Sequence, residues 1–156
     1  MHIDSNNNWY KDIETRINSS KSSLSKKEYN KYQLDTLLRI SQRVRGFSPE
    51  CEECLRLQAD ISQMVDQSGN STGLSKDQYK AYCRSMNNII HHLREKHKLA
   101  LEGESLGIWI GIGAALGIVF GIIMDNIAIG IAIGAALGVT IGSSLNYKNK
   151  KDDRVI

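Results

Sequence analysis

The cysteines and histidines of this chain are the residues best suited to metal chemistry. Cys51 and Cys54 form a Cys-x-x-Cys pair, and His91, His92 and His97 follow further along the chain. Thiolates one helical turn apart, joined by an imidazole from a second helix, are a common ligand set for tetrahedral zinc. The sequence therefore suggests a structural zinc site, with Cys51, Cys54, His91 and His92 as its candidate ligands.

This zinc hypothesis depends on an antiparallel pairing of the two helices that carry the candidate ligands. If the chain turns back in the loop 66–74, Cys51 lies level with His91. The fourth ligand is the difficulty, because His92 and His97 point about 140° apart around an ideal helix. The alternative is that the cysteines are small core residues and the histidines are surface or interface groups.

No arrangement of residues in the sequence indicates an enzyme. A thioredoxin-like role for the cysteine pair is disfavoured, because no strand precedes it and Glu50, Glu52 and Glu53 oppose thiolate formation. The sequence has no Ser-His-Asp arrangement, and no phosphate loop or dinucleotide fingerprint with the strand that such a motif requires. We therefore expect a non-enzyme; the competing class, a metal-dependent enzyme, predicts bound metal with an open coordination position.

Helices must position these residues, and two of them begin at capping boxes. Ser25 is followed three residues later by Glu28, and Ser75 by Gln78. In both places a Leu and a Tyr are spaced as a hydrophobic staple. Apolar residues at helical spacing follow Ser25 and stop at Gly46, which we expect to end that helix.

Similar start and stop residues predict two more helices. Ser48 as the cap and Pro49 in the first helical position predict a helix that ends near Gly69. A shorter amphipathic helix around Trp9 precedes the others, and the Ser/Lys stretch 19–23 separates it from them. The helix that begins after Ser75 is expected to continue towards Leu101.

Composition divides the 156-residue chain into three parts. Residues 1–105 are polar, helix-forming and without a period-two strand pattern, so we expect an all-α fold with a cytosolic three- or four-helix bundle. Residues 106–145 contain one charged residue, Asp125, and residues 146–156 form a basic tail. A formal net charge of +3, without a basic stripe or a DNA-reading motif, gives no reason to expect nucleic acid as a partner.

The apolar segment 106–145 is long enough to cross a bilayer twice. Residues 106–124 and 127–145 each form a helix of about 28 Å, which matches a hydrocarbon core of about 30 Å. An unpaired carboxylate at mid-bilayer costs at least about 2.5 kcal/mol. We therefore expect a two-helix transmembrane hairpin with Asp125 and Asn126 in its turn.

Basic residues flank the two predicted spans on one side only. They are Lys96 and Lys98 before the first span, and Lys148, Lys150, Lys151 and Arg154 after the second. The positive-inside rule then places both termini in the cytoplasm, in the cell (inner) membrane. The first residues resemble no secretory signal, because they have neither a basic n-region nor an apolar h-region, which agrees with this topology.

Glycines recur every four residues on both predicted spans. They are Gly113, Gly117 and Gly121 in the first, and Gly130, Gly134, Gly138 and Gly142 in the second. This spacing forms a stripe at which helix backbones can approach closely in lipid. Residues 113–121 also match residues 134–142, which suggests a duplicated helix. The pattern resembles the glycine-zipper hairpin of small bacterial membrane proteins, and implies close helix packing and oligomerisation but no particular activity.

These features favour a membrane-anchored helical adaptor or sensor that is bacterial, homo-oligomeric and bound to an unknown cytosolic protein. The alternative is a membrane-perturbing effector, holin-like or defence-associated, whose bundle restrains a pore-forming hairpin. The spans offer few polar residues for a pore, although hydrophobic pores exist and gate by dewetting.

Overall fold

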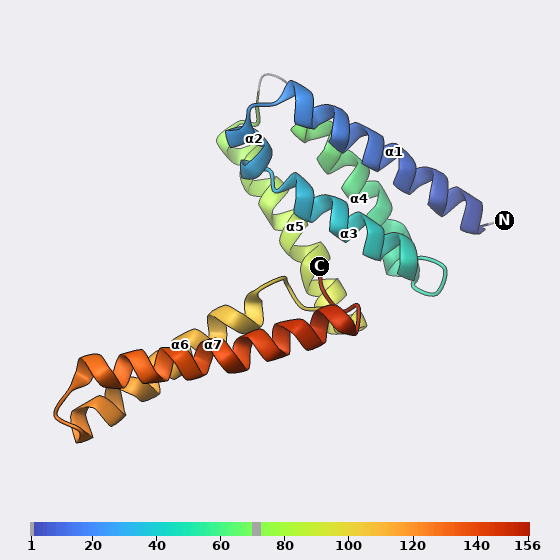
Figure 1. The fold of residues 1–156 in the computed structure, drawn as a ribbon. Helices are drawn as coiled ribbons and strands as arrows, with labels where there is room; N and C mark the ends of the chain where they lie inside the picture. The colour runs from blue at the N-terminus through green and yellow to red at the C-terminus, as the bar shows by residue number, and fades with distance from the viewer. Residues whose placement is uncertain (1, 70–72) are drawn as a thin grey trace. The chain divides into compact units, whose positions relative to one another are not determined.

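The computed structural model describes residues 2–69 and 73–156, and helices make up most of them (Figure 1). The helices are α1 (His2–Ser23), α2 (Lys26–Lys31), α3 (Leu34–Phe47), α4 (Glu52–Ser68), α5 (Lys76–His97), α6 (Glu104–Ile123) and α7 (Ile127–Lys151). This confirms the expected all-α class. The chain forms two compact units, Met1–His97 and Lys98–Ile156.

The first unit, which we call the bundle, is built around α1, α3 and α4, which lie side by side (Figure 1). Each of these helices turns an apolar stripe inward, and α5 packs on α3 and α4. The buried side chains include Ile13, Ile17, Leu37, Ile40, Val44, Cys54, Ile61, Ile89 and Leu93. Removal of this apolar surface from water is the main favourable term in the folding of the bundle.

The single helix predicted from Ser25 to Gly46 is broken at Gln33, which separates α2 from α3. Gln33 has a left-handed φ of 51°. The preceding residue, Tyr32, is 1% exposed, and its carbonyl oxygen accepts a hydrogen bond from the Tyr82 hydroxyl at 2.7 Å. The long-range contacts of Tyr32 therefore outweigh the helical preference of the local sequence. The predicted capping box at Ser25 is present.

The connection between α3 and α4 differs from the prediction. Gly46 lies inside α3, and the Ser48 N–H donates to the Val44 carbonyl at 2.9 Å. Ser48 therefore closes α3, whereas we had expected it to begin the next helix. The turn through Pro49 delays α4, so that Cys51 becomes its N-cap.

The ends of α1 and α5 also differ from the prediction. The stretch 19–23, expected as a separator, is the last part of α1. Its serine hydroxyls donate back to carbonyls of the preceding turn, as Ser20 does at 2.9 Å, so these polar groups are satisfied within the helix. Helix α5 ends at His97 and does not reach Leu101, because Lys98 has a left-handed φ of 55°.

The second unit is a hairpin of α6 and α7, with its turn at the predicted residues. Asp125 has a φ of 51°, and the Asn126 side chain caps α7 by accepting from the Ile129 N–H at 3.2 Å. Helix α7 continues through Lys151, so the first half of the predicted basic tail 146–156 is helical. Both helices are long and apolar enough to cross a membrane.

Seven glycines, which we call the zipper glycines, hold α6 and α7 in backbone contact. They are Gly113, Gly117, Gly121, Gly130, Gly134, Gly138 and Gly142. A Cβ atom placed on any of them would lie closer than 3.0 Å to a backbone atom of the other helix or of its N-cap. The zipper glycines therefore close the hairpin on itself.

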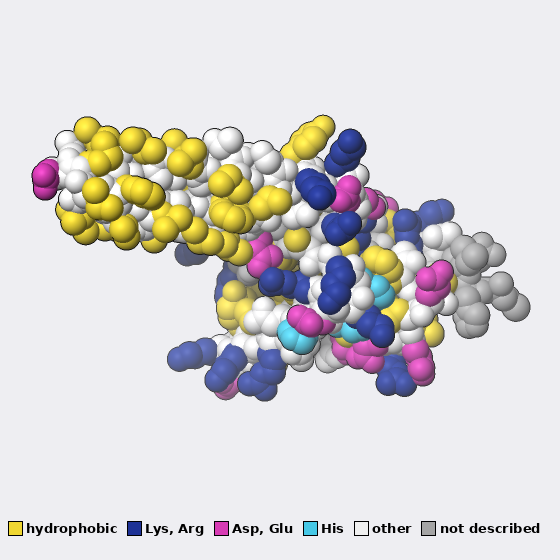
Figure 2. Space-filling view, turned by 90° about the horizontal axis from the view of Figure 1, so that it is seen from below, with side chains coloured by type: hydrophobic (Ala, Val, Ile, Leu, Met, Phe, Trp, Pro, Cys, Tyr) yellow, Lys and Arg dark blue, Asp and Glu magenta, His cyan; other side chains and the backbone are white. Residues whose placement is uncertain are grey.

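The outer surface of the hairpin is apolar. Figure 2 shows hydrophobic side chains along most of its visible face. Exposed large residues include Leu116, Phe120 and Ile123 from α6 and Ile133 and Leu137 from α7. Water disfavours a contiguous apolar surface of this kind, whereas lipid tails match it. The outer surface of the hairpin is therefore suited to a lipid bilayer.

Residues 100–103 and 154–156 close the open end of the hairpin. The Ala100 N–H donates to the Arg154 carbonyl at 2.7 Å, and the Ile156 N–H donates to the Ala100 carbonyl at 2.9 Å. Lys150 Nζ and a Glu102 carboxylate oxygen form an ion pair at 2.7 Å. These contacts fix where the chain enters and leaves the helix pair.

Candidate metal centre

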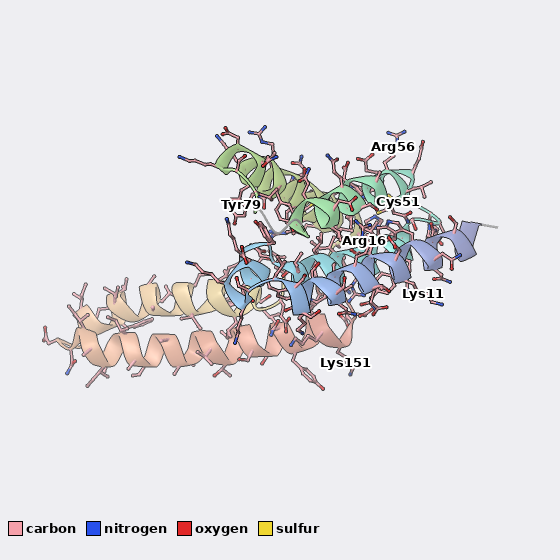
Figure 3. All side chains as sticks on the ribbon, turned by 90° about the horizontal axis from the view of Figure 1, so that it is seen from above. Lys11, Arg16, Cys51, Arg56, Tyr79 and Lys151 are labelled. Atoms are coloured by element: carbon pink, nitrogen blue, oxygen red, sulfur yellow. The ribbon has the colours of Figure 1, made fainter. Side chains whose placement is uncertain are left out.

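Four potential ligands meet where α4 begins and α5 ends. The ligand atoms of Cys51, Cys54, His92 and His97 all lie within 4.8 Å of one another. We call this group the Cys2His2 cluster. Figure 3 labels Cys51 at the start of α4.

The separations within the cluster suit a tetrahedral metal ion. His92 Nε2 lies 3.5 Å from Cys51 Sγ and 3.4 Å from Cys54 Sγ, and His97 Nε2 lies 3.3 Å from Cys54 Sγ. A tetrahedral zinc ion, bonded to sulfur at about 2.3 Å and to nitrogen at about 2.0 Å, holds adjacent S and N ligands about 3.5 Å apart. The donor set and its spacing therefore fit zinc.

Local structure explains why the two sulfur atoms lie together. Cys51 is the N-cap of α4, with an extended backbone at φ −128° and ψ 107°. Cys54 lies three residues later in the first turn, and residues at this spacing share one face of a helix. Cys54 is fully buried, whereas Cys51 is partly exposed. The pair thus spans the boundary between the core and the surface.

The imidazole rings are held by contacts with each other and with α3. The His97 ring stacks on Phe47, with ring centroids 3.9 Å apart and planes 15° apart. The rings of His92 and His97 meet edge to face at 5.3 Å. Phe47, the last residue of α3, therefore orients His97 towards the sulfur atoms.

The surroundings set the protonation of two ligands. Burial raises the pKa of the Cys54 thiol to about 12, and contacts with Cys51 and the charge of Glu53 act in the same direction. Burial also lowers the pKa of His97, and His92 and Lys96 lower it further. His97 is therefore a neutral imidazole at physiological pH, whereas Cys54 must lose a proton to bind a metal.

The structure brings three of the four sequence-predicted ligands together. His91 is exposed and lies outside the cluster, on the rim of a polar surface hollow that also includes Glu53 and Glu95. His97 stands in the fourth position. Helical directions alone disfavour His97, because it lies five residues after His92, but the two imidazole side chains are long enough to converge.

The third cysteine is not part of the cluster. Cys83 neighbours Tyr79, whose pKa it raises. With four protein ligands, the cluster has no coordination position for a substrate, and such closed sites are structural in zinc proteins. The arrangement can therefore tie α4 to α5, and it gives no support to metal catalysis.

Comparison with known proteins finds a similarity in the other unit. Residues 101–148 match the family model described as glycine zipper membrane protein. No curated protein and no solved structure matches the chain. The match covers α6, α7 as far as Lys148 and all seven zipper glycines, and the bundle lies outside it. Residues 101–148 are therefore similar to glycine zipper membrane proteins, as the glycine spacing indicated.

Proposed function

We propose that this chain is a membrane-anchored helical adaptor or sensor. The hairpin anchors it in the inner membrane of a bacterium, and the bundle binds a protein partner or responds to a signal in the cytoplasm. One observation carries this proposal: the zipper glycines pack within one hairpin, and large aliphatic side chains face outward. A helix pair of this kind is self-contained in lipid and needs no further subunit to satisfy its backbone.

The distribution of charge supports a topology with both termini in the cytoplasm. Lys148, Lys150 and Lys151 occupy the last turn of α7, and no Lys or Arg lies in the turn at Asp125 and Asn126. Juxtamembrane basic residues are enriched on the cytoplasmic side of membranes.

We further propose that the Cys2His2 cluster binds structural zinc and that the chain is not an enzyme. The support for zinc is the tetrahedral spacing of two thiols and two imidazoles around one point. Zinc at this place would link the start of α4 to the end of α5.

The proposal includes a homo-oligomer that forms through outward-facing glycines. Gly107 and Gly111 have no atom within 4 Å of an added Cβ, so they remain open to another helix. Small residues on an exposed transmembrane face allow close helix contact. Because the zipper glycines already pack α6 against α7, we expect Gly107 and Gly111 to lie at contacts between copies of the chain.

The competing proposal is a membrane-perturbing effector that assembles into a pore. The polar residues available to line its lumen are Thr140, Ser143 and Ser144 on the exposed face of α7, with Asp125 and Asn126 in the turn. The Thr140 and Ser144 hydroxyls already donate to the carbonyls of Ala136 and Thr140, at 2.9 Å each. Because these donors are satisfied within α7, the face is compatible with lipid, which favours the anchor.

Inducible expression in a bacterial host, with a potential-sensitive dye, separates the two functions. The adaptor or sensor predicts an unchanged membrane potential at high membrane levels of the protein. A collapse in the wild type that Gly111→Leu prevents, at equal expression, would overturn it in favour of the effector. A fluorescent protein fused to the C-terminus tests the topology. It fluoresces if the C-terminus is in the cytoplasm, and it does not fluoresce if it has been exported across the membrane as an unfolded chain.

A further inference from the structure

We propose that the Cys2His2 cluster is a redox switch, in which hydrogen peroxide joins Cys51 to Cys54 as a disulfide and expels the zinc. This inference rests on the proposed zinc site and names the signal to which it responds. It concerns a reversible change of state in this chain, and it assigns no catalytic turnover to the cysteine pair.

The two sulfur atoms are placed for disulfide formation. They lie within 4.8 Å of each other, and a disulfide requires about 2.05 Å. Cys51 precedes the first residue of α4 and has an extended backbone. A rotation of the Cys51 side chain can therefore bring the sulfurs together while the body of α4 stays intact.

The two thiols differ in their access to solvent. Cys51 is partly exposed and lines a surface hollow of about 380 Å³, together with Asn6, Pro49 and Leu55. Cys54 is fully buried. Oxidant-sensing cysteine pairs combine an accessible sulfur with a resolving thiol close behind it. The geometry assigns the first role to Cys51 and the second to Cys54.

The reaction balances with peroxide as the only oxidant. Both cysteines react as the thiolates that bound zinc would hold. The Cys51 thiolate attacks one peroxide oxygen, the O–O bond breaks, and hydroxide leaves to give a sulfenic acid. The Cys54 thiolate then attacks the Cys51 sulfur, the S–O bond breaks, and a second hydroxide leaves. Two electrons pass from the two thiolates to one peroxide. Zinc leaves as Zn²⁺, because two of its four ligands have changed from thiolates to the sulfurs of a disulfide.

Oxidation would act on one end of α5. At its start, α5 is held by the Tyr82 hydroxyl on the Tyr32 carbonyl and by Lys31 over the Tyr79 ring. At its other end it is held by His92 and His97 in the cluster. Loss of zinc therefore loosens the last turn of α5, after which the chain continues into the membrane unit.

The test uses the full-length, detergent-solubilised protein carrying Cys83→Ser, so that Cys51 and Cys54 are its only thiols. Hydrogen peroxide is added while a chromogenic chelator reports released zinc, and free thiols are counted in parallel. We expect about one zinc released and about two thiols lost per chain, with reversal by dithiothreitol and added zinc. A non-reducing gel and peptide mapping must show the disulfide within one chain.

A matched variant isolates the disulfide step. Cys51→His removes the accessible sulfur and cannot form the disulfide, so the same peroxide should leave the buried Cys54 thiol countable in this variant. A zinc-loaded Cys83→Ser protein that keeps its metal in excess peroxide would overturn the switch and leave the zinc site standing. A purified protein without zinc overturns both proposals.

Discussion

The Nε2 atom of His97 lies 3.3 Å from the Sγ atom of Cys54, although 43 positions separate the two residues in the chain. This contact joins the last residue of α5 to the first turn of α4. Phe47 stacks on the same imidazole, so the ends of α3 and α5 and the start of α4 meet at one place. The bundle therefore concentrates its metal-binding side chains at the end from which the chain leaves towards the hairpin.

Removal of a cluster ligand should abolish zinc binding, whereas removal of the neighbouring histidine should not. We expect His97→Ala to lower zinc affinity by more than about 100-fold, since loss of a ligand exceeds the usual effect of its outer-shell partners. His91→Ala is the matched control, because His91 is exposed and outside the cluster. Metal analysis of purified protein and titration against a chelator measure both. Equal losses in the two variants would contradict this ligand assignment.

Zinc affinity should rise with pH. The pKa of Cys54 is raised to about 12, so at neutral pH the metal-free protein carries a thiol that zinc must deprotonate. His97, whose pKa is lowered, stays neutral and adds little dependence above its own titration. Affinity should therefore increase about tenfold per pH unit for each thiol proton displaced. Calorimetry in buffers of different ionisation enthalpy counts these protons, and a value of zero would exclude thiolate ligation.

A bulky residue should open the hairpin at Gly134 and leave it intact at Gly111. A Cβ on Gly134 would overlap the Gly113 carbonyl oxygen, whereas one on Gly111 meets nothing within 4 Å. We expect Gly134→Leu to destabilise the hairpin by about 3 kcal/mol, the upper range for overpacking. Thermal unfolding in detergent, followed by circular dichroism, compares the two variants. Similar melting of Gly134→Leu and the wild type would rule out the close packing of α6 on α7.

The Tyr82 hydroxyl should stabilise the bundle measurably. It donates to the Tyr32 carbonyl at 2.7 Å, and the Tyr82 side chain is buried. Tyr82→Phe leaves that carbonyl oxygen without this donor, so we expect a loss of about 1–3 kcal/mol in the free energy of unfolding. Tyr147→Phe, at a residue that is 72% exposed, should change stability little. Urea unfolding of the full chain in detergent measures both, and equal effects would contradict a specific role for Tyr82.

Three of the four side chains in the Cys2His2 cluster could be predicted from the sequence. Cys51, Cys54 and His92 were predicted to meet, because a Cys-x-x-Cys pair at a helix start and a histidine on the following helix converge by simple geometry. His97 was not predicted as a ligand. Its position depends on the stack against Phe47 from a third helix, and no local pattern records such a contact.

The sequence by itself determined the membrane hairpin, its turn at Asp125 and Asn126, and the capping boxes at Ser25 and Ser75. Span length, glycine spacing and side-chain capping depend on residues that are near one another in the chain, so the sequence pattern is enough to predict them. Only the tertiary structure decided the break at Gln33 and the selection of His97 over His91. Both depend on side chains that reach across helices, where a single buried hydrogen bond or ring contact outweighs local helical preference.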